Sequence, residues 1–192
     1  LLFQKLYDRF KSNEKIFVFN SDAIDYNYEA INKNQKSLIV GNLPFNISTQ
    51  LLINWMVNYR WPPFYSKMIL MFQKEVANRI IASHNQKSYS RISVISQARC
   101  EIKPLLNAPS DIFFPKPKVD GTILEFSPIS KYLDIDISNL QKLLRKSFEH
   151  RRKKIKTSLK DYDYLLKRFS IDDGLRAENL SVDDYCKLAS AI

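Results

Sequence analysis

Short apolar runs alternate with segments of helical periodicity through the first part of the chain, and this alternation constrains the fold more than any other feature. Residues 16–19 and 37–40 are apolar without polar alternation, as expected of parallel strands that are buried on both faces. Residues 67–72 predict another buried strand, and residues 121–126 predict a last strand after a proline-rich loop. Strands that alternate with helices in this way are typical of an α/β fold.

Helices are predicted between these runs and again after the last of them. Residues 49–58, 75–82 and 91–98 carry apolar side chains at helical spacing. From about Asp134 onward the spacing is helical throughout, which predicts a small all-helical domain. Its apolar positions are Leu140, Leu143, Leu144, Phe148, Ile155, Leu159, Leu165, Leu166 and Phe169.

A short connector at residues 127–130, Ser-Pro-Ile-Ser, separates the two patterns. We therefore expect an α/β domain over residues 1–128 and a helical domain over residues 131–192. A chain of 192 residues with 45% hydrophobic content is long enough to bury the core of one such domain and a small appendage.

The charge of the chain favours a polyanionic partner. The formal net charge is +10, and the sequence pI is about 9.5. Clustered Lys and Arg side chains gain affinity for nucleic acid by releasing counterions from its phosphates. No apolar run of 18 residues and no signal peptide is recognisable, so we expect a nucleic-acid partner and no membrane.

Cys100 and Cys186 are the only cysteines of the chain. Neither stands at metal-ligand spacing from a histidine, so we expect no disulfide framework and no metal site. This cysteine usage fits a reducing compartment such as the cytoplasm. Nothing in the sequence indicates oligomerisation.

The chemistry is predicted at the end of the run 37–40, which leads directly into residues 41–45, Gly-Asn-Leu-Pro-Phe. The carboxyl ends of parallel strands are where α/β sheets place their ligands. The Asn42 side-chain oxygen and the Leu43 carbonyl could accept both hydrogens of an exocyclic amine such as that of adenine. Pro44 restricts the backbone around that carbonyl, and Phe45 could stack on an extruded base. The structural alternative is a plain strand-to-loop turn with Phe45 in the core.

Five segments in order, GNLPFNIS, QKEVANRI, FFPKPKVDG, HRRKKI and RAENLSVDDY, resemble the ribosomal RNA adenine dimethyltransferases, the kasugamycin-sensitivity methyltransferase family. This resemblance covers nearly the whole chain. It implies a Rossmann-like class I methyltransferase domain followed by a helical domain. It also implies S-adenosylmethionine as the cofactor and two adjacent adenosines near the 3′ end of small-subunit ribosomal RNA as the target. The small ribosomal subunit would be the partner, in the cytoplasm.

The resemblance assigns residues to the site. Asn42, Leu43, Pro44 and Phe45 match the catalytic motif, with Phe in place of the commoner Tyr. Asn42 is also implied at the cofactor. Phe113 opens the F-x-P-x-P-K-V-D pattern and would cover the other face of the target adenine, although a core position is the alternative.

Asp22 and Ala23 match the Asp-Ala pair that the family places at the adenine of the cofactor, while Ser21 replaces the usual Gly. Their structural alternative is an Asx turn after a strand. Gln73, Glu75 and Arg79 are interpreted as a solvated helix start rather than as catalytic groups.

A cluster of basic residues is predicted to bind RNA from the first long helix of the C-terminal domain, where a solvated face is the alternative. The residues of this cluster are Arg145, Lys146, Arg151, Arg152, Lys153 and Lys154, with His150 and Lys156 beside them. We interpret Ser181 as the N-cap of the final helix.

The Gly-rich cofactor loop of this family has no counterpart among the three glycines, Gly41, Gly121 and Gly174. By resemblance the chain starts at the helix that follows the second strand, so the first strands of the sheet would be missing. We therefore expect exposed apolar surface at the sheet, weak cofactor binding and little activity of this chain alone.

Two other functions remain open. The large-subunit ribosomal RNA adenine methyltransferases of macrolide resistance share the catalytic turn, but Leu43 and the R-A-E-N-L-S segment favour the small-subunit family. Adenine methyltransferases of DNA usually carry Pro at the position of Leu43. A non-catalytic RNA-binding factor in ribosome assembly is the alternative from a different class.

Overall fold

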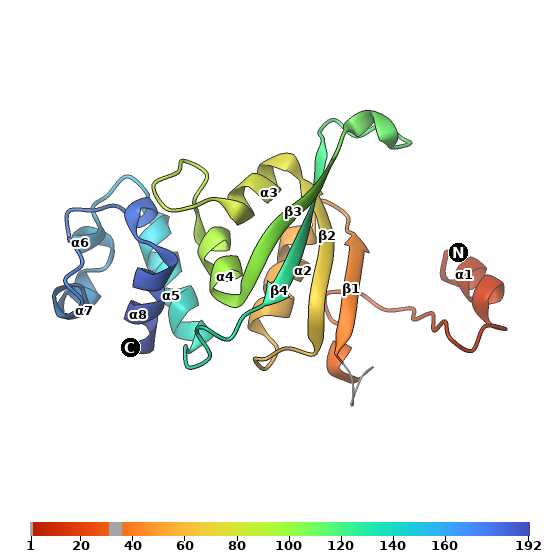
Figure 1. Ribbon diagram of the computed structural model, residues 1–192, viewed down its shortest axis with the longest axis horizontal. Helices are drawn as coiled ribbons and strands as arrows, with labels where there is room; N and C mark the ends of the chain where they lie inside the picture. Colours follow the sequence, from red (N-terminus) through yellow and green to blue (C-terminus); the bar gives the residue numbers. More distant parts are fainter. Residues whose placement is uncertain (1, 31–35) are drawn as a thin grey trace.

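A four-stranded sheet with the order β1-β2-β4-β3 lies at the centre of the computed structural model, which describes residues 2–30 and 36–192 (Figure 1). Strand β1 pairs in parallel with β2, whereas β4 runs antiparallel to both β2 and β3. The strands are β1 (Ser37–Asn42), β2 (Tyr65–Gln73), β3 (Cys100–Ala108) and β4 (Gly121–Pro128).

Three of the four predicted strands form, and they are β1, β2 and β4. The fourth prediction, residues 16–19, is wrong: this segment joins no strand of the described sheet. Phe17 and Phe19 are 75% and 55% exposed. An apolar run becomes a strand only when another strand satisfies its backbone groups, and no described neighbour does so here.

Strand β3 was not predicted, because it carries Pro104 and lies at a sheet edge, where prolines are tolerated but strand signals are weak. It forms a hairpin with β4 without a crossover helix, so the sheet is mixed rather than parallel throughout.

Strand β1 lies at the other edge of the sheet (Figure 1). Its side chains alternate between partly buried and exposed, so the prediction of burial on both faces is wrong. Ile39 packs against the core, whereas Leu38 and Val40 point to the opposite face and are 56% and 69% exposed. The apolar surface expected at the sheet is therefore present along β1.

The three helices that the periodicity predicts are present, and they lie on the face of the sheet opposite to Leu38 and Val40. They are α2 (Ser48–Val57), α3 (Lys74–Ile81) and α4 (Arg91–Arg99). The helices α3 and α4 contact the sheet, and α2 packs on α4. Helix α1 (Leu2–Phe10) buries no residue and lies apart from the sheet (Figure 1). Leu1, the first residue of the predicted N-terminal helix, is outside the described residues.

The C-terminal part is helical, as predicted. Its elements are α5 (Ile137–Glu149), α6 (Ile155–Ser158), α7 (Asp163–Arg168) and α8 (Val182–Ser190). Asp136 caps α5 by accepting from the Ser138 amide at 2.7 Å, and Ser181 caps α8 by accepting from the Asp184 amide at 3.1 Å. No helix among residues 2–30 and 36–192 has the length and apolar character needed to cross a membrane.

Helices α5 and α8 pack against α4, so the helical part joins the core of the sheet part. Buried residues of both parts form one hydrophobic cluster that includes Phe72, Ile95, Leu143 and Tyr185. The division at residues 127–130 remains a prediction. Short 3-10 helices fill the connections: η1 (Tyr28–Ala30), η2 (Ser110–Ile112), η3 (Lys160–Tyr162) and η4 (Ala177–Asn179).

Candidate functional site

A cleft of about 330 Å³ opens at the carboxyl end of β1. It brings together two segments that lie far apart in the sequence, the turn after β1 and the proline-rich loop between η2 and β4. All five residues predicted as catalytic line it. The lining residues are Asn42, Leu43, Pro44, Phe45, Met71, Phe113, Phe114, Pro115 and Pro117.

The turn after β1 leaves two hydrogen-bond acceptors unused. The Pro44 carbonyl accepts from the Ser48 amide at 3.0 Å, and the Phe45 carbonyl accepts from the Ser48 hydroxyl at 3.2 Å, which starts α2. The Asn42 side chain and the Leu43 carbonyl have no hydrogen-bond partner among the described residues. Both acceptors are therefore available to a ligand in the cleft.

Gly41 allows this turn to fold tightly. A Cβ atom at this position would lie 2.8 Å from Leu43 Cδ2 and 3.2 Å from Leu70 Cδ2. A larger residue would require the side chain of Leu43, which lines the cleft, to shift.

Aromatic rings supply the walls of the cleft. Phe45 and Phe113 are partly buried, whereas Phe114 is fully exposed. None of the three stacks on another aromatic ring of the described residues, and all three line the cleft. Two free acceptors beside aromatic rings match the hydrogen-bonding edge and the faces of a planar base that carries an amine.

The loop that carries Phe113 is held at both ends. The Ser110 amide donates to the Asp120 carboxylate at 3.0 Å, and the Lys74 amide donates to the Asp120 carbonyl at 2.9 Å. Asp120 therefore fixes the loop to the start of α3, which positions Phe113 opposite the turn after β1.

Ala23 lines a separate hollow of about 190 Å³, which shares no lining residue with the cleft, whereas Asp22 is not among the residues that line either of them. One Asp22 oxygen accepts from the Ile24 amide at 2.8 Å, so the Asx turn is present. The Asn54 side chain donates to the Ile24 carbonyl at 2.8 Å and ties this turn to α2. Aromatic side chains wall the hollow, which is lined by Phe19, Ser21, Ala23, Tyr26 and Tyr28.

The predicted basic cluster is not on a single helix, because α5 ends at Glu149, residues 150–153 form a turn and Lys154 forms an isolated β-bridge with Arg176. Only Arg145 and Lys146 of the cluster lie on α5. His150 leaves the helical region, with φ −120° and ψ 64°, so the chain turns before Arg151.

Two residues of the basic cluster form ion pairs among the described residues, and the others do not. Lys146 pairs with Asp161 at 2.6 Å, and this hydrogen bond raises the pKa of the lysine. Arg151 pairs with Glu178 at 2.6 Å and also donates to the Lys87 carbonyl. The four remaining residues are exposed and form no ion pair with the described part of the chain: Arg145, Arg152, Lys153 and Lys154.

Glu75 and Arg79 form an exposed ion pair at 2.5 Å in α3, in agreement with a solvated helix start. Cys100 and Cys186 are free and buried, and burial raises the pKa of both thiols to about 12. Among residues 2–30 and 36–192, no cluster of His, Cys, Asp or Glu side chains is arranged to hold a metal ion.

Sequence reasoning missed Phe114 and Met71 in the cleft. The adjacent pair Phe113 and Phe114 in a proline-rich loop could have indicated Phe114. Two neighbouring rings in such a loop are rarely both buried, so one of them is available to a ligand. Met71 faces the cleft through the pairing of β2 with its neighbours, which no local pattern specifies.

Comparison with known proteins gives a consistent family. The family model described as ribosomal RNA adenine dimethylase matches residues 1–192. "Ribosomal RNA small subunit methyltransferase A" of Rhizobium etli (strain CIAT 652) is 36% identical over 180 residues, which are 93% of this chain and 66% of that protein. The protein of the same name from Allorhizobium ampelinum is 38% identical over the same shares of both chains. The chain thus spans just under two thirds of the length of these relatives.

Solved structures share the fold. A dimethyladenosine transferase from Plasmodium falciparum superposes with a TM-score of 0.80 at 22% identity, covering 97% of this chain and 76% of that one. The 23S rRNA methyltransferase ErmE superposes with a TM-score of 0.65 at 18% identity, with the same coverage.

Proposed function

The chain belongs to the ribosomal RNA adenine dimethylase family and has its Rossmann-like methyltransferase fold, and from this premise we propose that it methylates adenine in small-subunit ribosomal RNA. The reaction moves methyl groups from S-adenosylmethionine to the exocyclic amines of two adjacent adenosines in a hairpin loop. The observation that supports it most is the cleft, where two free acceptors lie beside unstacked aromatic rings.

The residues of the cleft compensate for the low nucleophilicity of the target amine. The amine lone pair of adenine is delocalised into the ring, so the nitrogen is a poor nucleophile. The Asn42 side-chain oxygen and the Leu43 carbonyl accept the two amine hydrogens and hold the nitrogen in one orientation. Phe45 and Phe113 stack on the two faces of the base, and stacking of about 1 to 3 kcal/mol per ring offsets the cost of extruding it.

S-adenosylmethionine supplies an activated methyl group on a sulfonium. When bound, the cofactor would give up this methyl group from its sulfur to the amine nitrogen that Asn42 and Leu43 hold, and the amine would lose one proton to solvent for each methyl group gained. Asn42 remains as an acceptor for the second transfer, when the amine carries one hydrogen and one methyl group.

The described residues fit this cofactor in part. The hollow at Ala23 is walled by Phe19, Tyr26 and Tyr28 and suits a planar adenine. Asp22 precedes Ala23 in the chain, and only one of its two carboxylate oxygens accepts a hydrogen bond within the described residues. No described glycine has a positive φ, and the three glycines lie apart in the sequence, so they form no Gly-rich loop for the rest of the cofactor. We therefore expect weak cofactor binding by these 192 residues on their own.

A methyl-transfer assay tests the proposal. Labelled S-adenosylmethionine and unmethylated small ribosomal subunits are incubated with this chain, or with the chain joined to the part of the Rhizobium etli relative outside the matched 180 residues. We expect methyl transfer only by the joined protein. Transfer by the chain alone would overturn the argument about the cofactor, and no transfer to small subunits by the joined protein would contradict the proposed activity.

A non-catalytic role in ribosome assembly is the second candidate, favoured by the exposed cations Arg145, Arg152, Lys153 and Lys154. Binding to the small subunit without methyl transfer by the joined protein would support it. Transfer to the large subunit instead would favour the macrolide-resistance type. We place either role in the cytoplasm, where the free, buried thiols of Cys100 and Cys186 stay reduced.

A further inference from the structure

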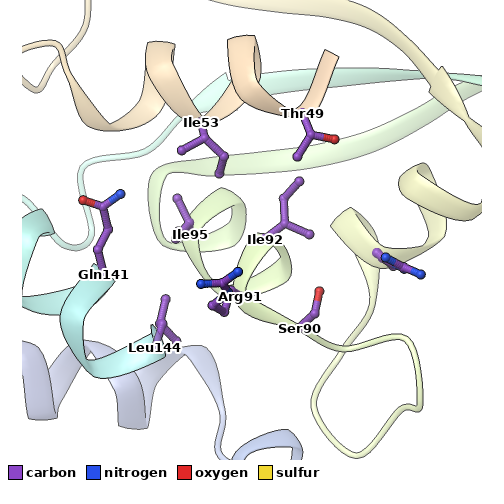
Figure 2. Close-up of a pocket in the computed structure, with 9 residues that line it drawn as sticks. Thr49, Ile53, Ser90, Arg91, Ile92, Ile95, Gln141 and Leu144 are labelled. Atoms are coloured by element: carbon purple, nitrogen blue, oxygen red, sulfur yellow. The ribbon is translucent and has the colours of Figure 1, made fainter. Parts of the chain in front are cut away.

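A pocket of about 410 Å³ lies where the helical part meets the helices of the sheet, outside the cleft at Asn42. Ile53 of α2 and Ile92 and Ile95 of α4 point into it, and Gln141 and Leu144 reach it from α5 (Figure 2). This volume lies within the range of about 300 to 1,000 Å³ that is usual for small-molecule sites.

The lining of this pocket combines an apolar floor with a positive rim. Arg79 and Arg91 are its charged residues, and none of its nine lining residues is acidic. Arg79 is paired with Glu75 at 2.5 Å, but the side chains of Arg91, Gln141 and Thr49 have no hydrogen bond or ion pair within the described part of the chain. A ligand that fits this pocket therefore has an apolar surface, polar groups at its edge and a negative charge.

We propose that this pocket binds one nucleotide of the RNA substrate next to the extruded adenosine, an inference that rests on the proposed function. The base lies against Ile53 and Ile92, and the amide of Gln141, which both donates and accepts, contacts its polar edge. The phosphate pairs with the Arg91 guanidinium, whose planar donors match phosphate oxygens.

The position of the pocket supports an RNA strand as occupant. The cleft and the pocket both border the start of α2, since Phe45 lines the cleft and Thr49 lines the pocket. On the other side, Arg145 is exposed one helical turn beyond Gln141 on α5, in the direction of residues 150–154 along the chain. An RNA strand that leaves the cleft along α2 would therefore cross the pocket before it reaches the predicted basic cluster.

Anisotropy titration with a labelled RNA hairpin that carries two adjacent adenosines in its loop tests this inference. Arg91→Gln should raise the Kd about tenfold, because a charge-assisted hydrogen bond contributes about 1.5 kcal/mol or more. It should also reduce the slope of log Kd against log salt by about 1. The matched control Lys142→Gln removes the same charge from an exposed position on α5 outside the pocket and should leave the Kd close to that of the unchanged chain.

Hairpins with a single abasic position identify the bound base. An abasic site at one position outside the target adenosines should raise the Kd of the unchanged chain. The same abasic hairpin and the intact hairpin should bind the Gln141→Leu variant with equal Kd. Equal losses in Arg91→Gln and Lys142→Gln, or insensitivity to every abasic position, would overturn the proposal. So would a phosphoserine peptide that displaces the hairpin from the unchanged chain but not from Arg91→Gln.

The two proposals fail in different ways. If the pocket inference is wrong, Arg91→Gln binds RNA normally while the joined protein still methylates small subunits. If the proposed function is wrong, the joined protein transfers no methyl group to small subunits, whatever the Arg91 variant does.

Discussion

The acceptors in the cleft are free because of how neighbouring residues begin a helix. Ser48 uses the carbonyls of Pro44 and Phe45, which leaves Asn42 and the Leu43 carbonyl to a ligand. The sequence motif predicted the residue types of this site, because the turn is local. It could not predict Met71, Arg91 or Gln141, whose places depend on strand pairing and helix packing between distant segments.

Phe114 gives a prediction at this scale. It is fully exposed in the loop that lines the cleft, so it can stack on a base next to the target. In the joined protein, Phe114→Ala should raise the KM for small ribosomal subunits about tenfold, since one stacking contact contributes about 1 to 3 kcal/mol. The thermal midpoint should not change. Ile112→Ala, in the same loop but outside the cleft, is the control, and an equal KM effect there would argue against stacking by Phe114.

Among the elements, strands were harder to predict than helices. The three helices predicted before the last strand form as α2, α3 and α4 because helical hydrogen bonds are local, and α3 and α4 pack on the sheet while α2 packs on α4. Residues 16–19 have strand-like composition but no described pairing partner, and β3 has a partner but little strand-like composition. The end of α5 at Glu149 was also missed, since charged residues continue past it without a proline or glycine.

The edge strand β1 leads to a prediction about association. Leu38 and Val40 form an exposed apolar row on a strand whose outer edge has no partner in the described sheet. Such edges promote contact between chains, and a lysine on the edge opposes it. Val40→Lys should lower the apparent mass of the concentrated chain in light scattering.

Ile192→Lys is the control for this effect, because Ile192 is exposed and the C-terminus lies among the C-terminal helices, away from β1 (Figure 1). Its apparent mass should equal that of the unchanged chain. If both lysine variants lower the mass equally, net charge rather than the β1 edge controls association.

For the whole molecule, the sequence predicted two parts but not how they join. The helical part packs against α4, and one hydrophobic cluster runs through both parts. This packing also builds the pocket at Arg91, which needs α2, α4 and α5 together.

The shared core predicts a single unfolding transition. Leu143 of α5 is fully buried, and Leu143→Ala should lower the free energy of unfolding by about 2 to 5 kcal/mol. Both tryptophans, Trp55 and Trp61, lie in the sheet part. Their fluorescence should nevertheless report the same shifted urea midpoint as circular dichroism. A tryptophan midpoint that stays in place while the dichroism midpoint falls would show that the two parts unfold separately.

The most direct test of the account is methyl transfer to unmethylated small ribosomal subunits by the joined protein carrying Asn42→Ala. We expect a loss of about a hundredfold in rate, similar to removal of one hydrogen-bonding group from other preorganised sites. Asn46→Ala, an exposed amide in the same turn outside the cleft, should keep the full rate. An Asn42→Ala protein as active as Asn46→Ala would contradict the central claim that the cleft at the end of β1 orients the target amine.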